Sequence, residues 1–304
     1  MTYWKDLKDK IKDIDCIKSS QIKYRCEQTI ITKVNSIPTC TTLLKSDYSV
    51  EKVIDIKNSI MNVYCKLDDN ITSIYPNQYN EALNMVMDLE KIKCNSVIDI
   101  DMDTGTMGRI INHDEVFNEW KYYCQNFKDK YKFLRSSETN EAVQQFVQSV
   151  DKIITDPKLL LADLSSKMFF MLIFDGYLVG KEEYKKSYNI IFSSMLFKDI
   201  RFPMTIIPII QKESPNIVIF DRKSDIGKSV KKMSDIERIY DKQFKPTIGY
   251  KFSEYDARFN ISERLHEDAT NYFNNYIENA EAYIIEEIPN NVNLTIHCKL
   301  RKID

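Results

Sequence analysis

The stretch Val292-Asn-Leu-Thr-Ile-His-Cys-Lys-Leu300, near the end of the 304-residue chain, alternates apolar and polar side chains with a period of two. Successive side chains of a β-strand point to opposite faces of a sheet, so this alternation predicts a strand with one buried face. A similar alternation of aromatic and polar residues occupies 248–261, and short β-branched runs lie at 202–210 and 216–220. The segment 188–304 is therefore predicted to be rich in strands.

The N-terminal part of the chain has the same character. Residues 22–34 and 50–67 are rich in Ile, Val and Tyr, which favour strands. Further along, Ser96-Val-Ile-Asp-Ile-Asp-Met-Asp103 is followed by Thr104-Gly105 and then by Thr106-Met-Gly-Arg-Ile-Ile111. This order predicts two strands joined by an Asp-Thr-Gly turn.

The middle of the chain changes to helical periodicity. Apolar residues from Val116 to Phe127 recur at intervals of three and four. Further helices are predicted at 138–154 and at 157–175, where Asp156-Pro157 supplies a start signal. A short amphipathic helix is expected at 3–14, and residues 269–288 fit a helix or a strand.

The most apolar span, 159–179, is interpreted as a buried helix. It contains Asp163, Lys167 and Asp175, which a lipid bilayer would penalise, so no membrane span is predicted.

Together these patterns predict an α+β fold in which antiparallel sheets are contributed by both ends of the chain and flank a helical central segment. The expected divisions are a strand-rich N-terminal half at 1–135, a helical segment at 136–187 and a strand-rich C-terminal half at 188–304. One integrated domain is the alternative, and a divergent duplication of the two ends is a further hypothesis.

The composition of the chain argues against several classes of protein. The chain has 43 basic and 45 acidic residues, a net charge of −2, and this balance argues against a nucleic-acid-binding protein. Its seven cysteines are dispersed without a CxxC pair, which argues against a disulfide framework or a zinc site. The first residues lack the apolar stretch of a signal peptide, so a cytoplasmic location is predicted.

Signals for metal, phosphate or catalytic sites are weak. Asp99, Asp101 and Asp103 resemble the opening of a calcium loop, but Thr104 and Ile110 stand where that loop requires its glycine and its bidentate acid. The run Asp225-Ile-Gly-Lys-Ser229 resembles the end of a phosphate loop, yet Arg222 occupies the position of the first glycine. His113, His266 and His297 share no metal-ligand spacing. No cofactor, metal or catalytic residue is predicted.

Aromatic residues near the C-terminus are the candidate binding residues, since tyrosine gives a large contact area at low entropic cost. The set is Tyr250, Phe252, Tyr255, Tyr272 and Tyr276. Packing in the core is the alternative role for the same residues.

The segment from Val97 to Asn112, with its Asp-Thr-Gly turn and Ile-Ile-Asn end, runs into Glu115-Val-Phe-Asn-Glu-Trp120. This arrangement resembles uncharacterised bacterial proteins that are encoded beside LysM and PAAR-like proteins of contractile injection systems. The resemblance covers about residues 80–180. It implies an accessory role in loading or delivering a secreted protein, and it supplies no catalytic residues.

The function predicted from the sequence is non-enzymatic binding of another protein, as an adaptor, chaperone-like factor or immunity-type partner. Two alternatives stay open. One is a hydrolase with a dispersed active site. The other is a carrier of a small ligand or lipid, which requires an apolar cavity of about several hundred cubic ångströms. The sequence leaves the oligomeric state open.

Overall fold

The fold is seen in a computed structural model, which describes residues 3–6, 17–130, 137–197, 200–231, 233–244, 249–268 and 270–304. Within these ranges the side chains of 17, 127–130, 137–143, 183 and 228–229 are not described. Of the helix predicted at 3–14, residues 3–6 are helical and the rest lies outside the described residues.

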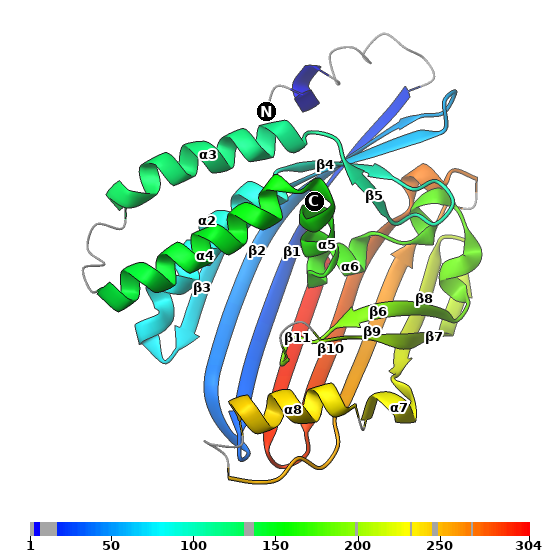
Figure 1. Cartoon of the computed structure of the whole chain (residues 1–304). Coiled ribbons are helices and arrows are strands. Elements are labelled where there is room, and N and C mark those ends of the chain that lie inside the picture. Colours follow the sequence, from blue (N-terminus) through cyan, green and yellow to red (C-terminus); the bar gives the residue numbers. More distant parts are fainter. Residues whose placement is uncertain are drawn as a thin grey trace.

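One continuous antiparallel sheet dominates the described part of the chain (Figure 1). Its 11 strands follow the order β5-β4-β3-β2-β1-β11-β10-β9-β8-β7-β6. The strands are β1 (Ile17–Val34), β2 (Ile37–Asp55), β3 (Ile60–Tyr75), β4 (Ser96–Ile100), β5 (Met107–Ile110), β6 (Tyr188–Ser193), β7 (Arg201–Ser214), β8 (Ile217–Asp225), β9 (Asp256–His266), β10 (Tyr276–Ile288) and β11 (Val292–Lys302).

The predicted α+β class is wrong, because the protein has a mostly-β fold built on this single sheet. The first and last strands pair with each other: Tyr24 of β1 lies opposite Lys302 of β11, and Val34 lies opposite Val292. The two ends of the chain therefore join at the centre of one sheet rather than forming separate sheets. A period of two along each strand predicts the strand but carries no information about which strand it pairs with.

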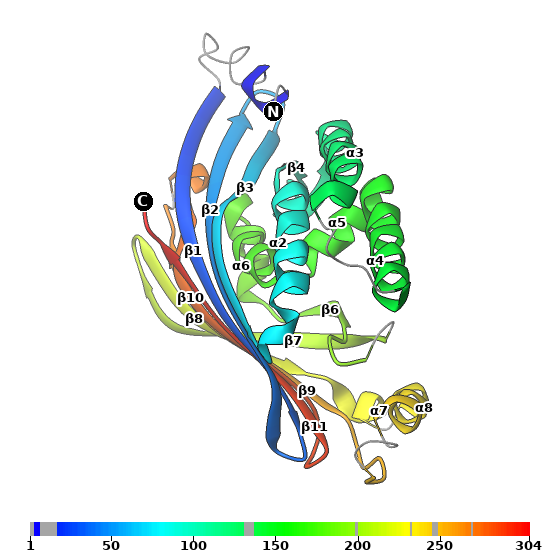
Figure 2. The same ribbon diagram turned by 90° about the vertical axis from the view of Figure 1, so that its left-hand side faces the viewer.

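The longer helices pack on the concave side of the curved sheet (Figure 2). The α-helices that follow β3 are α2 (Asn80–Cys94), α3 (His113–Lys130), α4 (Ser137–Thr155), α5 (Pro157–Ser165) and α6 (Met168–Ile173), with α7 (Gly227–Lys231) and α8 (Ser234–Gln243) further along the chain. Four 3₁₀ turns are described, η1 (Asn77–Tyr79), η2 (Gly176–Val179), η3 (Glu182–Lys185) and η4 (Tyr272–Asn274).

The structure refines two of the predicted helices. The helix expected at 138–154 is α4, whose bounds differ by one residue at each end. The helix expected at 157–175 is instead divided into α5 and α6, separated by Ser166 and Lys167. The segment 269–288, which fitted either element, forms η4 and β10. Within the described residues, no helix is both long enough and apolar enough to cross a membrane.

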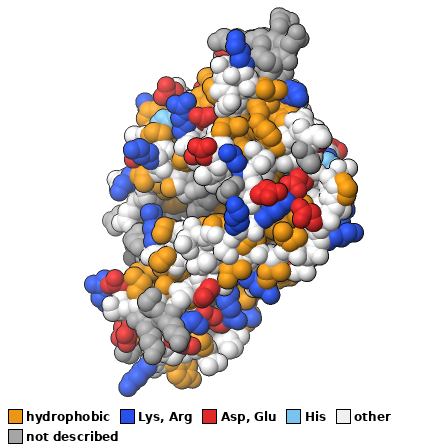
Figure 3. All heavy atoms as spheres, turned by 90° about the vertical axis from the view of Figure 1, so that its right-hand side faces the viewer, with side chains coloured by type: hydrophobic (Ala, Val, Ile, Leu, Met, Phe, Trp, Pro, Cys, Tyr) orange, Lys and Arg blue, Asp and Glu red, His pale blue; other side chains and the backbone are white. Residues whose placement is uncertain are grey.

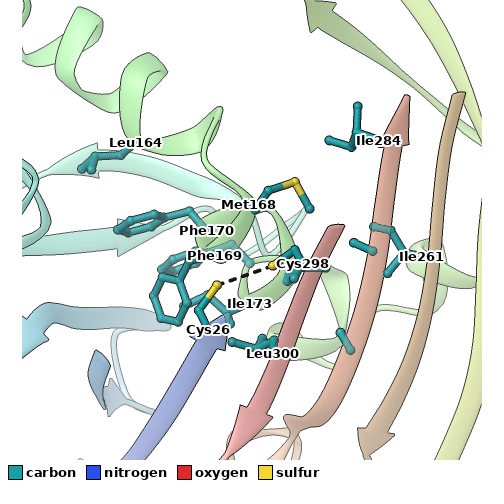
Figure 4. Packing of buried hydrophobic residues seen from close by; sticks show 14 of the residues in the cluster. Cys26, Leu164, Met168, Phe169, Phe170, Ile173, Ile261, Ile284, Cys298 and Leu300 are labelled. Atoms are coloured by element: carbon teal, nitrogen blue, oxygen red, sulfur yellow. Dashed lines mark hydrogen bonds between the residues drawn. The ribbon is translucent and has the colours of Figure 1, made fainter. Parts of the chain in front are cut away.

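Helix α6 lies in the centre of the core (Figure 4). Five of its six residues are buried, namely Met168, Phe169, Phe170, Leu172 and Ile173. The ring of Phe169 stacks on Tyr48 of β2 at a centroid separation of 3.7 Å. Beneath this helix the Sγ atoms of Cys26 and Cys298 lie 3.5 Å apart on β1 and β11, and both thiols are free. A helix that is apolar on all sides thus fills the trough of the sheet.

The opposite, convex face of the sheet carries polar side chains that pair across neighbouring strands. Arg25 of β1 lies 2.7 Å from Asp47 of β2, and His297 of β11 lies 2.7 Å from Glu281 of β10. This alternation of an apolar concave face with a charged convex face explains the period-two pattern of the long strands.

Lys52 is a buried cation on β2, 3% exposed, that contacts backbone rather than a carboxylate. Its Nζ donates to the carbonyl oxygens of Phe273 at 2.6 Å and Asn275 at 2.8 Å. Burial lowers the pKa of Lys52 to about 7. Lys52 thereby ties η4 to the N-terminal strands.

We expect Lys52→Met to flatten the dependence of stability on pH between pH 7 and 9. The folded-state pKa of about 7 lies below the unfolded value of 10.5. In this range the unfolded chain binds more protons, so the free energy of unfolding rises with pH. The rise amounts to about 2 kcal/mol. Urea denaturation of both proteins at pH 7 and 9 measures the difference. An identical rise in the two proteins would show that Lys52 stays charged in the folded state.

Candidate functional site

A cavity of about 570 Å³ opens beside α6, between the two outermost strands of the sheet. Its walls are mainly apolar and include Phe170 and Met171 of α6, Phe174, Ile190 of β6, and Phe259 and Ile261 of β9. Cavities of about 300–1,000 Å³ with mostly apolar walls are typical of small-molecule sites.

The cavity is lined by residues from both edges of the sheet. Met107, the first residue of β5, and the preceding Thr106 line the cavity together with residues of β6, although these strands stand at opposite ends of the strand order. Phe170 and Met171 of the short helix α6 form a further part of the lining. The side of the molecule that carries β6–β8 shows acidic and basic groups interspersed among apolar ones (Figure 3).

The turn between β4 and β5 closes one end of the site through Gly105. This glycine has φ +73°, and a Cβ added to it would lie 2.2 Å from the carbonyl oxygen of Asp175. The turn therefore packs directly on the backbone that precedes η2. A side chain at position 105 would separate the two segments.

Charged groups lie at this same end. Arg222 of β8 is 3% exposed; its Nη1 lies 2.5 Å from Oδ2 of Asp175 and donates to the hydroxyl of Tyr188 at 2.8 Å. Its Nε lies 2.8 Å from Oε2 of Glu263 as an ion pair, without the alignment of a hydrogen bond. Arg222, Asp175 and Tyr188 line the cavity. The end of the cavity is thus polar, while its walls are apolar.

Glu263 of β9 has an unusual environment for a carboxylate, because it is 2% exposed. Burial raises the pKa of Glu263 to about 7, and the adjacent Arg222 opposes this rise. The Asp175 carboxylate adds to the rise. Glu263 therefore changes its charge near neutral pH.

A second buried carboxylate fixes the other end of the site. Glu286 of β10, 0% exposed, accepts hydrogen bonds from the hydroxyls of Ser194 at 2.5 Å and Tyr255 at 2.8 Å. It also accepts from the backbone N–H of Met195 at 2.7 Å. These bonds hold the segment after β6, and Ser194 and Met195 line the cavity.

The aromatic residues predicted from the sequence do not gather on one surface. Tyr255 is fully buried beneath the segment after β6, and Phe252 packs on Tyr240 of α8 with ring centroids 5.8 Å apart. Tyr250, 58% exposed, lies near the same end of β9. Tyr272 and Tyr276 lie at the opposite end, where the Tyr276 ring stacks on His266. The two groups are separated by the length of β9, about 30 Å.

Asp99, Asp101 and Asp103, the residues that resemble a calcium loop, lie in β4 and in the turn that follows it, where Asp99 and Asp101 have different partners. Asp99 forms an ion pair with Arg109 at 2.8 Å, whereas Asp101 accepts the backbone N–H groups of Asp103 and Thr104. Across the described ranges, no cluster of three or more His, Cys, Asp or Glu residues is arranged to hold a metal ion.

The three histidines lie on different elements. His113 begins α3 and contacts the Ile154 carbonyl, His266 ends β9, and His297 is on the convex face.

The charged residues of the cavity were not singled out from the sequence, although a signal was present. In β8 the buried positions alternate as Val218, Phe220 and Arg222, and in β9 Glu263 occupies a buried position between Ile261 and Leu265. A charged residue in the apolar register of a strand indicates a buried polar site. Which partners it meets depends on pairing that the pattern does not contain.

Comparison with models of known protein families finds no match, and no curated protein matches the chain. Three chains of solved structures are similar, one of them from a structure on lipid–protein interactions in lipovitellin. That likeness has a TM-score of 0.42 and 9% sequence identity, and it covers 93% of this chain and 25% of the other. The chain thus spans a quarter of the length of that protein. At this TM-score the likeness supports no inference about function.

Proposed function

We propose that the protein binds a small, mainly apolar molecule in the cavity between α6 and β6, and acts as its carrier. The observation that carries the proposal is the cavity itself, about 570 Å³ with mostly apolar walls and a polar end. A ligand in it would contact Phe170 and Phe174 on one side and Ile190 on the other. Binding at such a site is favoured by burial of the ligand's apolar surface.

The hydrogen bonds of the polar groups in the cavity favour ligand binding over catalysis as the function of the site. Ser194, a hydroxyl that lines the cavity, donates to Glu286, which is also held by Tyr255 and by backbone N–H groups. Arg222 is likewise paired with acids. These groups stabilise the walls of the site, and no histidine or cysteine is among the described lining residues.

Ile190→Trp is the variant that tests the proposal. The larger side chain should occupy part of the cavity, and we expect the affinity for the neutral fluorescent probe N-phenyl-1-naphthylamine to fall by about tenfold or more. Titration of the probe by fluorescence measures the affinity. The matched control is Ile209→Trp on β7, where the residue is 39% exposed and lies outside the cavity lining.

Binding of the probe at one site, weakened by Ile190→Trp and unchanged by Ile209→Trp, would support the carrier function. Absence of probe binding to the wild-type protein, or equal affinity in all three proteins, would refute it. Thermal melts of both variants show whether a loss of binding reflects loss of the fold.

The adaptor role remains a prediction from the sequence, as does its link to contractile injection systems. The proposed small-molecule site does not depend on either.

A further inference from the structure

At the polar end of the cavity, one nitrogen of Arg222 is available to donate a hydrogen bond to a ligand. Arg222 uses Nη1 for Asp175 and Tyr188, while its Nε faces Glu263. Among the described residues, none accepts a hydrogen bond from Nη2. Because Arg222 lines the cavity and its guanidinium is always protonated, this nitrogen is placed to donate to a ligand.

The charge around that donor is unfavourable for an anion. One guanidinium faces two carboxylates, Asp175 and Glu263, and Glu263 is mostly ionised at pH 8 because its pKa is about 7. Tyr188 and Tyr177, which lie near these carboxylates, stay neutral at pH 8. Burial raises the pKa of Tyr188 to about 12 and that of Tyr177 well above its usual value. The cluster is therefore net negative at that pH.

We infer that the bound molecule carries an uncharged hydrogen-bond acceptor that lies beside Arg222, and that Glu263 and Asp175 together select against ligands ending in a carboxylate. This inference rests on the proposed function and names its ligand class, a neutral amphiphile such as a long-chain alcohol. A carboxylate beside Arg222 would meet two other carboxylates in a buried site, where charges interact more strongly than in water. A hydroxyl or carbonyl oxygen would accept from Nη2 without that repulsion.

The mouth of the cavity offers a different way to bind an acid. Arg201, exposed at the start of β7, also lines the cavity. An acid bound with its chain inward and its carboxylate outward would be held by Arg201 and would not sense Glu263. The two orientations therefore predict effects at different residues.

The experiment measures displacement of N-phenyl-1-naphthylamine by 1-decanol and by decanoate at pH 8. The wild-type protein is compared with Glu263→Gln, which keeps the size of the side chain and removes its charge, and with Arg201→Gln. The readout is the ratio of the decanol affinity to the decanoate affinity in each protein. The hydration of the two free ligands is the same for every variant, so it does not contribute to the change in this ratio. We expect Glu263→Gln to reduce the preference for decanol about tenfold, through tighter binding of decanoate. Arg201→Gln should leave the ratio within about twofold.

A second measurement keeps the test valid if Glu263→Gln fails to fold. In the wild-type protein decyl sulfate, which stays anionic over this range, should bind more tightly at pH 6 than at pH 8 because Glu263 takes up a proton, while decanol should be unaffected. A decanol-to-decanoate ratio unchanged by Glu263→Gln, a decyl sulfate affinity unchanged between pH 6 and pH 8, or a decanoate affinity that depends on Arg201 would overturn the inference. In either case the probe would still bind the wild-type protein. Failure of the proposed function is distinct, since the probe itself would then not bind.

Discussion

Replacement of Gly105 by alanine is expected to lower the free energy of unfolding by about 3–5 kcal/mol. The residue has φ +73°, and its new Cβ would lie 2.2 Å from the Asp175 carbonyl oxygen and 2.8 Å from Cα of Gly176. Both neighbours are backbone atoms, so a change of side-chain rotamer cannot relieve the contact. The turn must move away from η2, and we expect probe binding to weaken with it. Urea denaturation and probe titration measure the two effects.

Gly249→Ala is the control for this prediction. Gly249 has a similar φ of +78°, but a Cβ added there would meet no atom within 4 Å. It therefore carries the backbone strain without the collision, and we expect a loss of about 1 kcal/mol. Similar losses in the two variants would mean that the contact between the turn and Asp175 contributes nothing to stability.

Phe169→Ala is expected to cost about 3–5 kcal/mol of stability. Phe169 is 1% exposed at the centre of the sheet's trough, where it stacks on Tyr48 and meets Tyr24 and Phe170 edge-on. Truncation leaves a cavity between α6 and the strands β1 and β2, and the surrounding sheet is held by its long ladders of hydrogen bonds. The void therefore collapses only in part. The midpoint of urea denaturation measures the loss.

Met171→Ala on the same helix is the matched comparison. Met171 is half-buried and lines the cavity that is already open, so its truncation enlarges an existing space and should cost about 1 kcal/mol. Equal losses for the two variants would contradict the central position of Phe169 in the core.

Local elements of this fold follow from the sequence because they depend on nearby residues. The alternation at 292–300 corresponds to β11, and the Asp-Thr-Gly turn joins β4 and β5, which pair as predicted. The start signal at Asp156-Pro157 is confirmed, since Asp156 accepts the backbone N–H of Lys158 and begins α5. In each case the side chain or the spacing that forms the element lies within a few residues.

The class of the fold does not follow in the same way. Whether the two strand-rich ends form one sheet depends on the pairing of Cys26 with Leu300 and of their neighbours, across most of the length of the chain. Both ends have the same period of two, and that pattern permits separate sheets as well as one. The sequence pattern therefore predicts strands but not the continuous sheet that makes the fold mostly β.

The candidate site also depends on contacts between residues that are far apart in the sequence. The cavity brings residues of β5, α5, α6 and β6–β9 together, and its polar end joins Asp175, Arg222 and Glu263. The aromatic density near the C-terminus predicts binding residues that include Tyr255 and Tyr276, but Tyr255 is fully buried and Tyr276 stacks on His266. Charged residues in the apolar register of β8 and β9 were the more informative signal, because burial of a charge requires a partner.

A crystal structure with 10-bromo-1-decanol tests the carrier function most directly, since bromine can be located by its anomalous scattering. We expect one bromine peak within the cavity bounded by Phe170, Phe174 and Ile190, with the hydroxyl oxygen within hydrogen-bonding distance of Arg222. A bromine peak elsewhere, for example over the exposed Leu43 and Ile71, with the cavity empty of ligand, would contradict it.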